Sequence, residues 1–161
     1  MPPTNLQQTL KSRLHNATAV VLLGVGSELR GDDAAGLLVA EQLSSLKLPN
    51  LQVLIGGTAP ENLTGEIKRL KPSHLLIVDA ADLKEVPGTI KLLAPDEIGG
   101  FSFSTHALPL KVMIDFILAD HQCEVIIIAI QPKDVNFGAP VAPAVQKAIG
   151  ELSDALRSLF I

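Results

Sequence analysis

The chain has 161 residues, of which 47% are hydrophobic and 19% charged, and its formal net charge of −4 and aromatic content of 3% argue against a nucleic-acid-binding surface. Its purest apolar run, residues 125–130, is far shorter than the roughly 18 residues that a membrane helix needs. The single cysteine suits a reducing compartment, and the N-terminal segment MPPTNLQQTLKSRLHN has no apolar core of a secretory signal, so we expect a cytoplasmic protein.

Four short apolar runs alternate with longer amphipathic segments along the chain. The runs are residues 19–25, 51–55, 74–79 and 124–130. Runs of this kind are typical of strands that are buried on both faces of a parallel sheet. A fifth strand is expected over 89–93. It follows the third run too closely for a crossover helix, so we expect it to pair locally and antiparallel with the strand that ends at Asp79.

Amphipathic patterns predict the helices between these strands. They are expected over residues 4–15, 33–46, 60–70, 107–120 and 140–159. The first belongs to an N-terminal helical extension, residues 1–17, whose apolar stripe packs outside the core. The alternation predicts an α/β fold, a three-layer α/β/α sandwich with a mixed, mostly parallel twisted sheet of about five strands. We expect one domain over residues 1–161.

Three side chains that could do chemistry follow expected strand ends or precede a helix. Asp33 follows the first strand, Asp79 ends the third, and His106 lies just ahead of a helix. Ligands of open α/β sheets bind beyond the carboxyl ends of the strands. Two carboxylates and one imidazole suit a divalent metal of the nickel or zinc kind. The sequence spacing leaves open whether the three converge.

Each candidate also has an ordinary structural interpretation. Asp32 or Asp33 could cap the helix that begins there, and a lone histidine such as His106 is often structural. Asp79 is harder to explain in this way, because a carboxylate at the end of a buried strand is costly without a partner. Glu61 fits a capping box at a helix start, and we expect it to be structural.

The common catalytic motifs are missing from the sequence. Leu29 stands where a dinucleotide fingerprint needs its third glycine. The chain also lacks a P-loop, a G-x-S-x-G elbow, an H-E-x-x-H motif and a Cys-pair zinc site. These absences exclude several large enzyme classes.

Five segments instead carry a family resemblance. They are GVGSELRGDDAAG at 24–36, GGTAPEN at 56–62, LIVDAAD at 76–82, STHALPL at 104–110 and IQP at 130–132. In this order they resemble the hydrogenase maturation endopeptidases, in particular the type that processes the large subunit of hydrogenase 3. Ser27 stands where that family usually has asparagine.

The resemblance implies an endopeptidase that removes the C-terminal extension of a [NiFe]-hydrogenase large-subunit precursor after nickel insertion. It implies that Asp33, Asp79 and His106 contact the metal and carry the reaction, with Asp32 as the preceding acid of the motif. The nickel is then carried by the substrate and used for recognition, and no tightly bound metal of the protein's own is expected. We expect a monomer, because the site has to accept a large protein.

Two alternatives stay open at this point. One is a non-catalytic, nickel-sensing chaperone that binds the large subunit without shortening it. The other is an unrelated metallopeptidase that holds its own metal.

Overall fold

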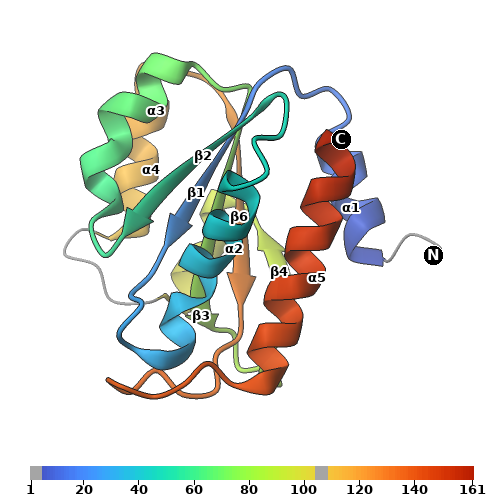
Figure 1. Ribbon diagram of the computed structural model, residues 1–161. Helices are drawn as coiled ribbons and strands as arrows, with labels where there is room; N and C mark the ends of the chain where they lie inside the picture. The colour runs from blue at the N-terminus through green and yellow to red at the C-terminus, as the bar shows by residue number, and fades with distance from the viewer. Residues whose placement is uncertain (1–4, 104–108) are drawn as a thin grey trace.

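A six-stranded mixed sheet forms the middle layer of the molecule (Figure 1). The computed structural model describes residues 5–103 and 109–161. The strands are β1 (Val20–Val25), β2 (Leu51–Gly57), β3 (His74–Asp82), β4 (Ile90–Leu93), β5 (Ser102–Phe103) and β6 (Glu124–Ile130). Their order is β2-β1-β3-β6-β4, with β5 paired to β3 off this path. The first, second, third and sixth strands are parallel, and the other two run antiparallel to their partners.

Helices cover both faces of the sheet, which confirms the expected three-layer α/β/α sandwich (Figure 1). One face carries α2 (Ala35–Ser44) and α5 (Pro143–Phe160), and the other carries α3 (Thr64–Leu70) and α4 (Leu110–Leu118). Three short 3-10 helices precede some of these elements: η1 (Gly31–Ala34), η2 (Pro60–Leu63) and η3 (Pro95–Gly100). None of the helices within 5–103 and 109–161 has the length and apolar content of a membrane span.

The central strands β1, β3 and β6 are almost entirely buried because each of them contributes side chains to two cores. Side chains alternate between the two faces of a strand, so neighbouring residues enter different cores. The α2–α5 core contains Leu22, Leu76 and Ile126, which are aligned across three strands. The α3–α4 core contains the next residue of each strand, Leu23, Ile77 and Ile127. This two-sided burial explains the absence of a polar alternation in the sequence.

The strand predicted over 89–93 pairs with a different neighbour from the one expected. β4 is antiparallel, as predicted, but it pairs with β6, with Leu92 opposite Ile128. Pairing with the strand that ends at Asp79 is therefore wrong. The reason is that β1 and β6 already occupy both edges of β3 from His74 onwards. One edge of β3 becomes free only after Val78, where its pairing with β1 ends. The short strand β5 pairs with this edge at Ala81 and Asp82, and the sequence did not indicate this strand.

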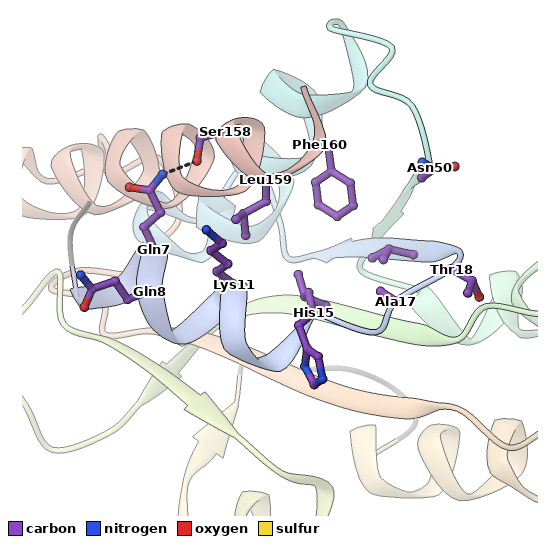
Figure 2. A pocket seen from close by; sticks show the side chains of 12 residues that line it. Gln7, Gln8, Lys11, His15, Ala17, Thr18, Asn50, Ser158, Leu159 and Phe160 are labelled. Carbon is purple, nitrogen blue, oxygen red and sulfur yellow. Dashed lines mark hydrogen bonds between the residues drawn. The ribbon is translucent and has the colours of Figure 1, made fainter. Parts of the chain in front are cut away.

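The N-terminal helix α1 (Asn5–Arg13) packs on α5 and contributes to the core. Leu10 is fully buried among the side chains of the α2–α5 core, so the expectation that the helix lies outside the core is wrong. Gln7 Nε2 donates to Ser158 Oγ at 2.6 Å, beside an open hollow of about 620 Å³ between the two helices (Figure 2). The apolar stripe of α1 is thus covered by the chain's own fold.

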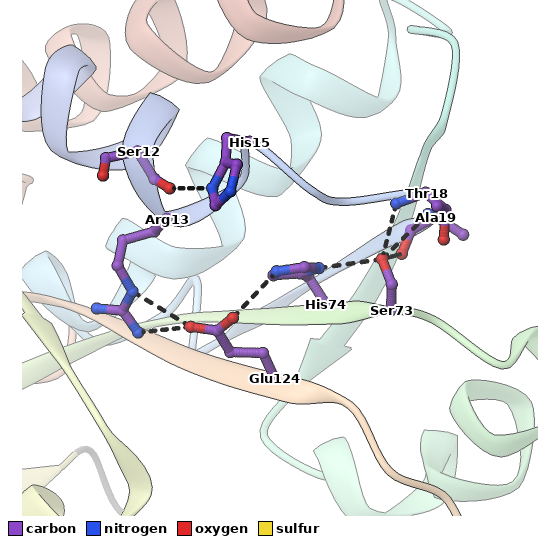
Figure 3. Close-up of polar contacts among 8 residues, drawn as sticks. All are labelled: Ser12, Arg13, His15, Thr18, Ala19, Ser73, His74 and Glu124. Carbon is purple, nitrogen blue, oxygen red and sulfur yellow. Dashed lines mark hydrogen bonds and ion pairs between the residues drawn. The ribbon is translucent and has the colours of Figure 1, made fainter.

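A polar network ties the end of α1 to the sheet (Figure 3). Arg13 Nη2 donates to Glu124 Oε1 at 3.1 Å. Glu124 Oε2 lies 3.1 Å from His74 Nε2, an ion-pair distance without hydrogen-bond geometry. The other ring nitrogen of His74 lies 3.0 Å from Ser73 Oγ. His74 is buried, so this histidine belongs to the attachment of α1 at the amino ends of β3 and β6.

The burial of Leu10 predicts a large effect on stability. Leu10→Ala is expected to lower the free energy of unfolding by about 2–4 kcal/mol, because it leaves a cavity among packed side chains. Urea unfolding measures this change. Leu46→Ala, at a side chain that is 45% exposed, is the matched control. It should change stability by less than about 0.5 kcal/mol. Equal small effects of the two substitutions would show that α1 adds nothing to the core.

Candidate functional site

The carboxyl ends of β1, β3 and β6 meet at one edge of the sheet, at the lower end of the molecule in Figure 1. Two loops cover this edge. The first, residues 26–34, follows β1 and ends in η1, and the second, residues 131–142, joins β6 to α5. Open α/β sheets bind their ligands at such an edge. The motif at 24–36 therefore lies where a ligand is expected.

Asp33 lies in η1, and its carboxylate is held at one oxygen only. The backbone N–H of Ser27 donates to Asp33 Oδ2 at 3.1 Å and to its carbonyl oxygen at 3.2 Å. The second oxygen, Oδ1, is buried and has no hydrogen-bond partner among residues 5–103 and 109–161. Gly26 permits this close turn, because a Cβ there would lie 1.9 Å from the Asp33 carbonyl oxygen. No side chain caps η1 or α2, so the capping interpretation of Asp33 is wrong.

Asp79 lies inside β3, fully buried and opposite Ala129 of β6. It comes one residue after Val78, where the pairing of β3 with β1 ends. The residues that follow it, 80–82, line a pocket of about 220 Å³ together with Asp33. The structure thus brings Asp33 to the segment directly after Asp79.

This pocket combines charged and apolar side chains. Its lining comes from both covering loops and from the paired ends of β3 and β5, and comprises Arg30, Asp33, Ala80, Ala81, Asp82, Ser102, Phe103, Pro132 and Val135. Six of these residues lie in the family motifs at 24–36, 76–82 and 130–132, although of the six only Asp33 is predicted to contact the substrate. The motifs do not include Ser102, Phe103 and Val135, because β5 and the 131–142 loop give no periodic signal. The arrangement can hold a peptide segment beside a carboxylate.

The third predicted ligand, His106, lies outside the described residues. Within 5–103 and 109–161, no three His, Cys, Asp or Glu side chains are grouped so that they could hold a metal ion. The trio of Asp33, Asp79 and His106 accordingly stays a prediction. The described part of the chain supplies its two carboxylates.

Asp32 anchors the 131–142 loop and does not cap a helix. Its Oδ2 accepts the backbone N–H groups of Lys133 and Asp134 at 2.8 and 2.9 Å, and its Oδ1 accepts that of Ala142 at 2.7 Å. The N–H of Asp32 donates in turn to the carbonyl oxygen of Asp134 at 2.9 Å. Charge-assisted bonds of this kind are stronger than neutral ones. The first acid of the motif therefore fixes one wall of the pocket from more than a hundred residues away.

The hydrogen bonds of the Asp32 carboxylate lead us to expect a loss of stability when this side chain is replaced by its neutral isostere. Asp32→Asn is expected to lower the free energy of unfolding by about 1–3 kcal/mol, because an amide donor then faces backbone N–H groups that have lost an acceptor. Hydrogen exchange should show faster exchange of the amides of Lys133, Asp134 and Ala142. Unchanged protection of these amides would contradict the anchoring role.

Glu61 and Gln131 have roles that the sequence did not predict. Glu61 was expected in a capping box, but the N-cap of η2 is Ala59 and makes no side-chain cap bond, so this expectation is wrong. Glu61 Oε2 is buried and finds no hydrogen-bond partner among the described residues. Gln131 was not singled out, yet its buried Oε1 accepts the N–H groups of Leu83 and Glu85 at 2.6 and 3.3 Å. It thus holds the turn between β3 and β4.

Cys123 is not a candidate nucleophile. It lies just before β6, at the amino edge of the sheet and far along the strand from the pocket. Burial raises the pKa of its thiol above the ordinary value. A thiol is a weak nucleophile compared with its thiolate.

Comparisons with known proteins agree on one family. Residues 37–158 match the family model described as "Hydrogenase maturation protease". The hydrogenase 3 maturation protease of Escherichia coli K12 is 42% identical over 130 residues, which are 80% of this chain and 83% of that protein. The [NiFe] hydrogenase maturation protease HycI from Thermococcus kodakarensis superimposes with a TM-score of 0.87 at 29% identity, over 94% of this chain and 98% of that one. The endopeptidase HycI from Escherichia coli gives a TM-score of 0.79 at 39% identity, over 88% and 90% of the two chains.

Proposed function

This chain belongs to the hydrogenase maturation protease family, and we propose that it recognises its substrate through nickel that the substrate already carries. It is an endopeptidase that processes the large-subunit precursor of a hydrogenase. The proposal concerns how the described edge of the sheet selects and cuts this precursor.

The half-held carboxylate of Asp33 is the observation that carries the proposal. One of its oxygens accepts from the backbone N–H of Ser27, and the other is buried with no hydrogen-bond partner in the part of the chain that the structure describes. A buried carboxylate oxygen without a partner costs free energy in the folded protein. A divalent cation brought by the substrate would supply the missing partner, and carboxylate and imidazole ligands suit nickel. The donor chemistry therefore fits the ion.

We propose that Asp33, Asp79 and His106 contact the substrate nickel and so place the scissile peptide at the pocket. The metal polarises the scissile carbonyl or a water molecule, and water then attacks the carbonyl carbon. One of the three side chains takes the proton of the water and returns it to the leaving amine. The products are the mature carboxyl terminus and the released C-terminal peptide.

Recognition through the metal acts as a checkpoint. A precursor without nickel lacks the group that Asp33, Asp79 and His106 contact, so it binds weakly and keeps its extension. We also propose that the protein acts as a monomer, because the apolar stripe of α1 is already buried on its own chain. Light scattering should then give a molar mass near 17.0 kDa.

The proposal is tested by the metal content of the purified protein together with its activity. We expect far less than one metal ion per chain, and loss of the C-terminal peptide when the nickel-loaded precursor is added. One tightly bound zinc per chain, with cleavage blocked by its removal, would contradict recognition through substrate nickel. A stable complex with the precursor and no released peptide would make the protein a chaperone.

A further inference from the structure

Three large apolar side chains are exposed beside the candidate site. They are Leu29, Val135 and Phe137, with 58%, 41% and 76% of their surface accessible to solvent. We call them the apolar rim. They come from the two loops that cover the carboxyl edge of the sheet. The loops are joined at this place, because the N–H of Gly138 donates to the carbonyl oxygen of Leu29 at 2.9 Å.

The fold holds the rim in place rather than leaving it on loose loops. The carboxylate of Asp32 binds the 131–142 loop on both sides of Val135 and Phe137. The side chain of Asp134 accepts the N–H of Asn136 at 2.9 Å. Gly31 has a φ of +54°, and a Cβ at this position would clash with the carbonyl oxygen of Asp134. Apolar side chains that are exposed to water lose hydrophobic free energy, which a partner that covers them would restore. A fixed apolar surface is what a docking site requires.

The rim is continuous with the candidate site. Val135 lines the same pocket as Asp33, so a molecule that covers the rim reaches the carboxylate without a gap. We propose that the apolar rim is the docking surface for the large-subunit precursor, and that it contacts an apolar part of the precursor next to the scissile peptide. This inference rests on the proposed function. A second copy of this chain is a less suitable occupant, because it would cover the pocket that the substrate has to enter.

The test is the steady-state kinetics of peptide release from the nickel-loaded precursor. Phe137→Ser and Leu29→Ser are expected to raise KM about 30-fold each, because an interface hot spot contributes about 2 kcal/mol and roughly every 1.4 kcal/mol is a factor of ten, with kcat nearly unchanged. Phe116→Ser is the matched control. Phe116 is 56% exposed, and Lys68 Nζ lies 3.7 Å from the centroid of its ring, near the end of α3 that leads into the amino edge of the sheet. This control should leave KM and kcat within about twofold of the wild-type values.

The possible outcomes distinguish a failure of the docking proposal from a failure of the proposed function. If the wild-type protein cleaves the precursor and Phe137→Ser has the wild-type KM, the docking proposal is wrong. If sedimentation shows that Phe137→Ser turns a dimer into a monomer while KM stays the same, the rim joins two copies of the chain and the proposal is also wrong. If the wild-type protein releases no peptide, the proposed function fails. In that case the docking proposal is tested separately, by the dissociation constant of the complex between the Phe137→Ser variant and the precursor. A dissociation constant equal to that of the wild-type protein would overturn the docking proposal.

Discussion

Asp79→Asn is expected to abolish removal of the C-terminal extension, with a fall in the rate of peptide release of more than about 100-fold. The substitution keeps the size of the side chain and removes the negative charge with which the carboxylate attracts a divalent ion. Even changes to groups behind metal ligands cost 10- to 100-fold in activity or metal affinity, so the loss of a ligand should cost at least as much. The rate is measured by mass spectrometry of the peptide released from nickel-loaded precursor.

The control for this substitution is Asp154→Asn, at an exposed ion pair with Arg157 on α5. It should leave the rate within about twofold, because exposed pairs contribute little. Urea unfolding of both variants shows whether a loss of activity reflects a loss of fold. His106→Ala should behave like Asp79→Asn. Full activity of a folded Asp79→Asn variant would remove this carboxylate from the mechanism.

Gly36→Ala is expected to destabilise the protein by about 3 kcal/mol or more. A Cβ on Gly36 would lie 2.2 Å from the carbonyl oxygen of Val78 and 2.3 Å from that of Val25. Both neighbours are backbone atoms of central strands, so neither can move away without disturbing the sheet. The first turn of α2 would have to shift, and it follows directly on η1, which carries Asp33. Activity should therefore fall together with stability.

Gly150→Ala in α5 is the matched control for this effect. Apart from its chain neighbours and the backbone of α5, no described residue has an atom within 4 Å of the position of a Cβ on Gly150. Alanine is favoured over glycine inside a helix by about 1 kcal/mol, so this variant should be as stable as the wild-type protein or more stable. The comparison is made by urea unfolding at one temperature. If Gly36→Ala unfolds at the same urea concentration as the wild-type protein, α2 does not pack on the strand ends as described.

The layers of the fold were predictable because hydrophobic patterns report burial directly. The runs at 19–25 and 124–130 became central strands, and the stripe at 140–159 became α5. The neighbour of the strand over 89–93 was not predictable. Pairing depends on which edges are free, and the edges of β3 are taken by strands distant in the sequence. Local distance along the chain therefore pointed to the wrong partner.

Contacts between residues that are distant in the sequence also limited what could be predicted of the candidate site. The rule that ligands bind at the carboxyl ends of parallel strands placed Asp33 beside the end of β3, and the structure agrees. The anchoring role of Asp32 was hidden, because its three hydrogen-bond donors lie 101 to 110 residues away in the sequence. The buried position of His74 was hidden for a similar reason, since its cover comes from α1 and β6. The roles of Asp33, Asp79 and His106 come from the family resemblance.

The most direct test of nickel-dependent processing is the intact mass of the large-subunit precursor before and after incubation with this protein. Nickel-loaded and metal-free precursors are treated side by side at equal concentration. We predict that only the nickel-loaded precursor loses its C-terminal peptide, because only it presents the metal to Asp33, Asp79 and His106. Equal loss of the peptide from both precursors would contradict recognition through nickel.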